Sequence, residues 1–87
     1  MENDPTLPSV DNLKLVGVLY SGSDRIALLQ DRSDAKHSFA LRELDLVKDG
    51  SVMRINRTNV IFLLTEMGIS RTFSLELPGD NTIVKSN

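Results

Sequence analysis

The stretch NLKLVGVLYSGSDRIALLQDR, residues 12–32, decides the fold class. Its first half, residues 13–20, is apolar at almost every position, and residues 25–31 form a second β-like run. The cluster SGSD at 21–24 has turn chemistry, so the two runs predict a β-hairpin with a four-residue loop. A strand with one solvent-facing side should alternate apolar and polar residues. Because 13–20 does not alternate, something is expected to cover both of its faces.

Short β-like runs with turn signals between them continue along the chain. KHSFAL (36–41) is a third predicted strand, and SVMRINR (51–57) and NVIFLLTE (59–66) form a second tight hairpin. ISRTFSLEL (69–77) alternates clearly and predicts a half-buried strand. RELDLVKDG (42–50) has apolar residues at helical spacing followed by an Asp-Gly turn signal, so we expect a loop with one helical turn there.

These six runs predict an all-β domain, a small six-stranded antiparallel sandwich or semi-open barrel with at most one short helical turn. Residues 1–11 are interpreted as a flexible lead-in or linker, 12–77 as the β domain, and 78–87 as a flexible tail or linker. Two strands, 13–20 and 60–64, resist alternation, and in a two-sheet architecture they should be the most enclosed.

Composition excludes several classes of function. The chain has 87 residues, enough for one domain, and a net charge of −2, which gives no long-range field to attract nucleic acid or anionic lipid. It has no cysteine, so a disulfide, a thiolate nucleophile and a cysteine-based zinc site cannot form. No run approaches the length of about 18 apolar residues that a membrane span needs, so this segment is not expected to insert into a membrane.

The sequence contains no recognisable catalytic or metal-binding arrangement. His37 is the only histidine, and Ser38 beside it on a strand points to the opposite face, so the two cannot act as base and nucleophile. Asp24, Asp31 and Asp34 lack the spacing of a calcium loop and are interpreted as turn formers. Few aromatic residues are interleaved with the basic ones, which disfavours binding of single-stranded nucleic acid. We therefore expect no enzymatic activity, no cofactor and no metal.

Two segments resemble a known family in order and spacing. LKLVGVLYSGSDRIALLQ, residues 13–30, has an apolar strand with a Val-Gly-Val step at 16–18, then a short loop and an Ile-Ala-Leu-Leu strand. INRTNVIFLLTEMGISRTFSLEL, residues 55–77, carries the later pattern of the same family. Over residues 13–77 the chain resembles the periplasmic homology region of the inner-membrane C component of bacterial type II secretion systems. It departs from the family before the fourth strand, where only Gly50 remains of a glycine-containing segment.

The resemblance implies a non-enzymatic scaffold module in the periplasm, belonging to a protein anchored in the bacterial inner membrane. Such a module binds the N-terminal periplasmic domain of the outer-membrane secretin, which couples the inner-membrane platform to the outer-membrane pore. Contacts with other inner-membrane secretion components would be made by other regions of the protein. The periplasmic domain of the P-type lipoprotein of type IV pili, which binds the pilus secretin, has the same layout and is the nearest alternative. A small β-barrel that binds nucleic acid is the alternative from a different class.

A docking role offers a second explanation for the strand at 13–20. An apolar strand that is not fully enclosed can serve as the docking face for a partner. Under this hypothesis Val16, Val18 and Tyr20 form the outward set, and the strand 36–41 lies beside them. The candidate partner-binding residues are Val16, Val18, Tyr20, Ser38, Phe39 and Ala40. Whether the domain itself or a partner covers the second face is left open by the sequence.

Overall fold

The computed structural model describes residues 7–78 of the chain. A 3-10 helix, η1 (Val10–Asn12), precedes seven strands: β1 (Leu13–Ser21), β2 (Asp24–Asp31), β3 (Ser38–Arg42), β4 (Leu46–Val47), β5 (Gly50–Ile55), β6 (Asn59–Glu66) and β7 (Ile69–Glu76). They form two antiparallel sheets with the strand orders β1-β2-β3 and β4-β5-β6-β7. The predicted all-β fold is confirmed, with one strand more than expected because Leu46–Val47 pairs with β5.

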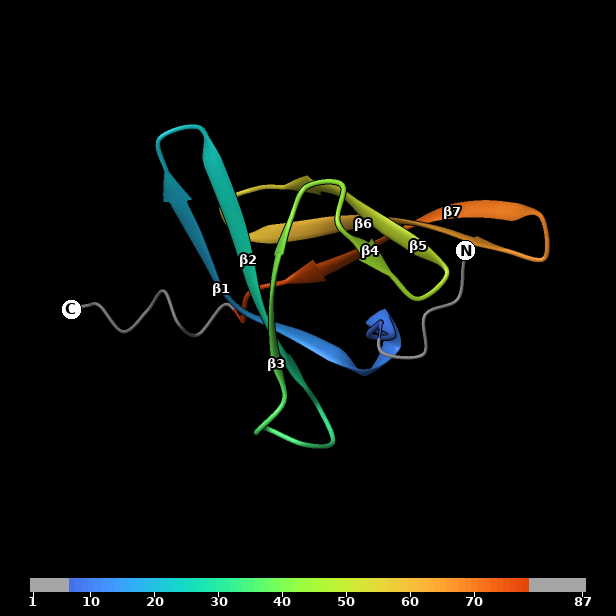
Figure 1. Ribbon diagram of the computed structural model, residues 1–87, viewed down its shortest axis with the longest axis horizontal. Helices are drawn as coiled ribbons and strands as arrows, with labels where there is room; N and C mark the ends of the chain where they lie inside the picture. The colour runs from blue at the N-terminus through green and yellow to red at the C-terminus, as the bar shows by residue number, and fades with distance from the viewer. Residues whose placement is uncertain (1–6, 79–87) are drawn as a thin grey trace.

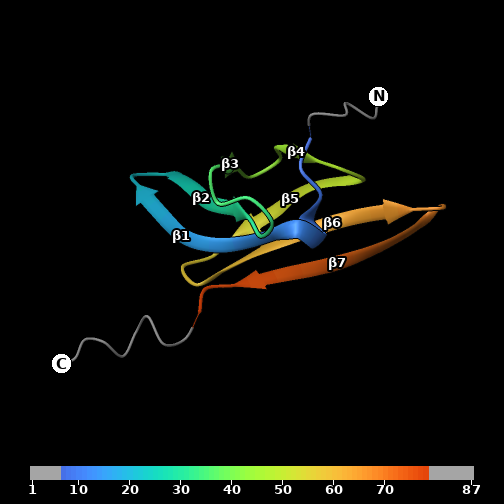
Figure 2. The same cartoon turned by 90° about the horizontal axis from the view of Figure 1, so that it is seen from below.

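The two sheets lie face to face, and their strands cross. In Figure 1, β1 and β2 run steeply through the view while β6 and β7 run close to horizontal. Figure 2, turned by a right angle, shows β7 along the lower border of the molecule with β1 above it. The segment between β3 and β4 joins the sheets at one side, because Leu44 N donates to Val52 O (2.8 Å) and Val52 N donates to Asp45 O (2.9 Å).

The core fills the space between the inner faces of the two sheets. Every residue of the core cluster is apolar, and no buried polar or charged residue occurs among the described residues. The cluster consists of Val10, Leu13, Leu15, Ala27, Leu29, Leu41, Val47, Val52, Ile55, Val60, Phe62, Leu64 and Leu75. Removal of this apolar surface from water is therefore the main force that holds the sheets together.

A β-bulge in each sheet interrupts the alternation of inward and outward side chains. In β1, Leu15 pairs with Leu29 and Gly17 pairs with Leu28, so Val16 is the extra residue. In β5 the corresponding shift falls at Met53. A bulge places two residues of one strand opposite one residue of its neighbour, so two consecutive side chains point to the same face. This geometry, rather than burial on both faces, explains why 13–20 does not alternate.

The expectation that 13–20 and 60–64 are the most enclosed strands is wrong for 13–20 but right for 60–64, because β6 has more buried residues than any other strand. At the bulge Val16 is 44% exposed, and beyond it Leu19 is 51% exposed. In β6, Val60, Phe62 and Leu64 are buried, but the intervening Leu63 is 39% exposed. Each strand therefore has one buried face and one apolar face that is partly open to solvent.

The helical turn expected within 42–50 does not form. Leu44 and Asp49 have positive φ angles of 78° and 66°, which are incompatible with a right-handed helical turn. Instead, the Asp45 carboxylate accepts a hydrogen bond from Arg42 N (2.8 Å) and closes a tight turn before β4. The first hairpin is also tighter than predicted, because β1 extends to Ser21 and β2 begins at Asp24.

The start of the domain lies earlier in the chain than the sequence predicted. Val10, which falls within the predicted lead-in, is buried in the core. Lys48 N donates to Pro8 O at 2.8 Å, which ties this segment to the turn after β4. Residues 1–6 of the predicted lead-in and 79–87 of the predicted tail lie outside the described residues.

The close approach of β5 to β6 gives a test of the fold. A Cβ added at Gly50 would overlap the backbone oxygen of Leu63, so the Gly50→Ala variant must displace a paired strand. We expect its free energy of unfolding in urea to fall by about 3 kcal/mol. Gly17→Ala is the matched control, because its Cβ would meet Leu28 at an ordinary 3.5 Å. Equal stability of the two variants would contradict the close approach.

Candidate partner-binding site

An open groove lies on the outer face of the sheet β1-β2-β3. Its volume is about 420 Å³. The central strand β2 forms the floor, and side chains of β1 and β3 form the two walls. The lining residues are Val16, Leu28, Leu29, Gln30, Ser38, Phe39 and Ala40.

The groove exists because small residues flank a large one in the same row of the sheet. Leu28 pairs with Gly17 on one side and with Ala40 on the other. Neither neighbour is large enough to cover the Leu28 side chain, so Leu28 remains partly accessible. The bulge adds an apolar wall, because Val16 points outward above this row. The result is an apolar groove that the domain itself leaves open.

A polar rim borders one end of the groove. In the next row of the sheet, Gln30 pairs with Ser38, and the Gln30 side chain donates to Ala35 O (3.3 Å) in the loop before β3. Asp31 Oδ1 accepts hydrogen bonds from Ser33 N (2.8 Å) and Ser33 Oγ (2.6 Å) in the same loop. The Ser33 hydroxyl first, and then its backbone N–H, hold the pKa of Asp31 below its ordinary value.

The structure brings four of the six predicted partner-binding residues together at the groove: Val16, Ser38, Phe39 and Ala40. Val18 does not join them, because the bulge turns it inward and it packs against the core. The expected outward set of Val16, Val18 and Tyr20 is therefore corrected to Val16 alone. Tyr20 lies at the end of β1, where its ring contacts the guanidinium groups of Arg25 and Arg57. Phe39 lines the groove although its side chain also packs against the core.

Three groove residues were missed from the sequence, Leu28, Leu29 and Gln30 of β2. A signal for Leu28 was present, because residues 26–29 are apolar at four consecutive positions, as 13–20 largely is. A run of this kind on a central strand marks a sheet whose outer face is apolar as well. Gln30 carries no such signal and is placed at the groove only by its pairing with Ser38.

Outside the groove, the charged side chains of the described residues that come together do so in pairs. Among residues 7–78, no group of three or more His, Cys, Asp or Glu side chains comes together to hold a metal ion. His37 Nδ1 lies 3.1 Å from Asp34 Oδ2, and both side chains are solvent-exposed. None of the helices in the described part of the chain has the length and apolar character needed to cross a bilayer. The groove on the sheet β1-β2-β3 is a place on the described surface where a partner could bind.

The Asp31 loop predicts a specific pH dependence. A carboxyl group whose pKa is lower in the folded state stabilises the fold above its unfolded pKa, and this stabilisation is lost as the pH falls through the folded pKa. Asp31→Asn should therefore be less stable than the parent at neutral pH, and the difference should vanish in acid. The free energy of unfolding in urea, measured from neutral to acid pH, gives this difference in stability. Ser33→Ala should reduce the same pH dependence, and an unchanged profile in both variants would contradict the assignment.

No model of a known protein family matches this chain, and comparison with curated proteins likewise gives no match.

Proposed function

We propose that this chain is a non-enzymatic periplasmic scaffold module of a bacterial type II secretion system. Its groove would bind the N-terminal periplasmic domain of the outer-membrane secretin and so couple the inner-membrane platform to the pore. The parent protein would be anchored in the inner membrane. The support comes from the sequence resemblance over residues 13–77 and from the groove, not from a family match.

The observation that carries the proposal is the position of the groove. The apolar pattern of 13–20 predicted a docking region formed by 13–20 and 36–41, and the groove lies between β1 and β3, which these segments form. The two strands are not the direct neighbours that the sequence predicted, because β2 lies between them. The groove's apolar residues Val16 and Leu28 gain by burial in an interface, and its polar rim at Gln30 and Ser38 can fix the register of a partner.

The position of the groove allows two kinds of contact at once. β1 and β3 are the edge strands of their sheet, so their outer backbone groups are available for pairing with a strand of a partner. Side chains of the partner would fill the groove over Leu28. We expect a small and transient interface, below about 1,200 Å² in total, because a secretion machine must rearrange. We expect micromolar affinity, about −8 kcal/mol.

The experiment that tests the proposal is an NMR titration of the ¹⁵N-labelled domain with the secretin's N-terminal periplasmic domain. Saturable shifts that cluster on Val16, Leu28, Ser38 and Ala40 are the expected result. The corresponding domain of a type IV pilus secretin is titrated in parallel, and tighter binding to it would favour the pilus alternative. No shifts with either secretin domain would overturn the proposal, and salt-dependent shifts with oligonucleotides would favour a nucleic-acid binder instead.

Val16→Arg should weaken binding of the secretin domain by about tenfold, because it places a charge at an apolar interface. Val16 is solvent-exposed, so the variant should keep its fold, which circular dichroism checks. Val18→Arg is not a suitable test, because Val18 packs against the core and the charge should unfold the domain.

Leu46→Arg is the matched control for Val16→Arg. Leu46 is an exposed apolar residue of a short edge strand, but it belongs to the other sheet. Isothermal titration calorimetry should therefore give the parent affinity for Leu46→Arg. If the two variants bind equally well, the groove is not the docking site.

A further inference from the structure

A second cluster of side chains lies at the end of the sandwich where β1 meets β2. The Tyr20 ring has the Arg25 guanidinium carbon 5.1 Å from its centroid and the Arg57 guanidinium carbon 5.2 Å from it. Arg57 belongs to the turn between β5 and β6, so this cluster spans both sheets. Both distances are within the range of a cation–π interaction.

The carboxylates near this end are already engaged within the domain. Asp24 accepts hydrogen bonds from the Arg42 guanidinium through both oxygens, each at 3.3 Å. Glu43 Oε2 accepts a hydrogen bond from Ile55 N at 2.9 Å, and Asp45 Oδ2 accepts one from Arg42 N at 2.8 Å. These acidic groups therefore serve the turns and strand ends of the fold.

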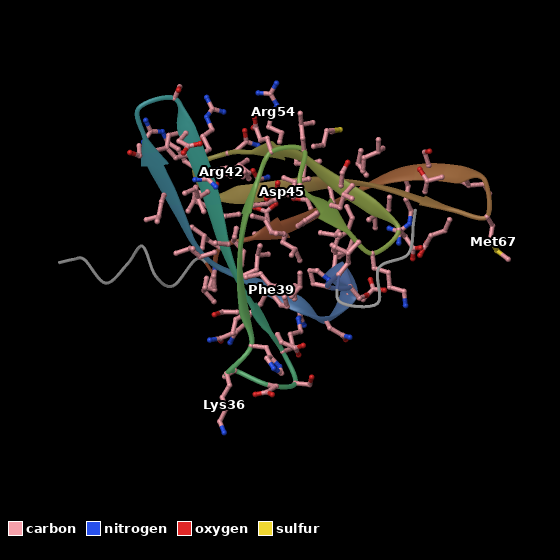
Figure 3. The ribbon with its side chains drawn as sticks, in the orientation of Figure 1. Lys36, Phe39, Arg42, Asp45, Arg54 and Met67 are labelled. Atoms are coloured by element: carbon pink, nitrogen blue, oxygen red, sulfur yellow. The ribbon has the colours of Figure 1, made fainter. Side chains whose placement is uncertain are left out.

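The arginines differ in how many hydrogen bonds and ion pairs their guanidinium groups make. Arg25 Nη1 donates to Ile55 O at 3.3 Å and lies 4.0 Å from Glu43 Oε2. Among the described residues Arg57 has no carboxylate within ion-pair distance and makes no side-chain hydrogen bond, and Arg54 has no ion pair either. Figure 3 shows Arg54 at the upper border of the molecule, above Arg42 and Asp45 in this view. This end consequently has unused positive charge and unused N–H donors.

Stacking on Tyr20 orients the Arg57 guanidinium group for binding a carboxylate. Contact with an aromatic ring restricts the guanidinium plane and leaves the N–H groups at its edge free to donate. The forked donors of arginine match the two oxygens of a carboxylate in a bidentate pair. A membrane surface, by contrast, is recognised by clusters of about four to eight basic residues. Among the described residues the β5–β6 hairpin carries two basic residues, Arg54 and Arg57, neither of which forms an ion pair with another described residue.

We propose that the Arg57–Tyr20 stack is a docking site for a carboxylate side chain of an acidic protein segment. The site is separate from the groove, because the Tyr20 side chain lies on the opposite side of β1 from Val16. It does not depend on the secretin proposal. Charge complementarity defines the partner: an extended segment with Glu or Asp exposed.

The test uses a capped glutamate-rich pentapeptide and its glutamine counterpart as probes. Titrated into the ¹⁵N-labelled domain at low salt, the glutamate peptide should shift the Arg57 Nε–Hε resonance saturably, and the glutamine peptide should not. The shift should weaken as salt is added, because exposed charges are screened. Absence of a saturable shift, or equal shifts with both peptides, would overturn the proposal.

Arg57→Gln should bind the glutamate peptide about tenfold more weakly, since it loses a charged hydrogen-bond donor. Arg71→Gln is the matched control. The Arg71 guanidinium carbon lies 5.8 Å from the centroid of the Phe73 ring, so Arg71 also stacks on an aromatic ring. Its Nη2 lies 3.7 Å from Glu66 Oε1, however, and it belongs to the distant β6–β7 hairpin. Arg71→Gln should bind the peptide like the parent.

Thermal unfolding checks that both variants remain folded. Equal affinity of Arg57→Gln and the parent would refute the site. Displacement of the peptide by phosphatidylglycerol vesicles, with tighter binding to the vesicles, would also refute it in favour of a lipid surface. Val16→Arg should leave peptide binding unchanged, so the outcome here is independent of the groove.

Discussion

The face-to-face packing of two small sheets is the constraint on which the rest of the structure depends. Leu29 of one sheet and Val52 and Phe62 of the other are fully buried, and no polar group among the described residues shares the core with them. An all-apolar core has no hydrogen bond to fix its register, so the phase of inward-facing residues along each strand must do so. Every outward side chain, including those of both proposed binding sites, takes its direction from that phase.

The bulge at Val16 determines which side chains of β1 face outward. Strict alternation from Leu15 would aim Val16, Val18 and Tyr20 at the same outer face. One extra residue reverses the phase, so Val18 packs inward and Tyr20 reaches Arg57 across the sandwich end. A single backbone irregularity thus separates an apolar groove from an aromatic–arginine cluster on one strand.

The strands and hairpins were easier to predict from the sequence than the bulges and the turn at Leu44. The hairpins β1–β2 and β6–β7 were predictable because turn residues punctuate the apolar runs, and Met67 and Gly68 have the positive φ angles that a two-residue hairpin requires. The bulges were not predictable, because an extra residue is defined by the count on the partner strand and not by local composition. The turn at Leu44 was missed for a similar reason: its positive φ is imposed by pairing of the flanking backbone with Val52. At the groove, the docking hypothesis for the apolar strand 13–20 included the residues of β3, whereas Leu28 required the sheet register.

Gly17 is not required by the fold, but the groove depends on it. Its φ is not positive, and a Cβ there would make only ordinary contact with Leu28, so the fold has room for a larger residue. Glycine in a strand interior costs conformational entropy and contributes no packing. What the missing side chain does provide is access to Leu28 from the β1 side, while Ala40 leaves it open from β3. The other edge strand, β3, is short, and the longer edge strand β1 is interrupted by its bulge, so the exposed apolar surface has no long, flat edge beside it. The fold does not require glycine at position 17, and it does not cover the neighbouring Leu28. Together these two features leave an open apolar groove in which a partner can dock.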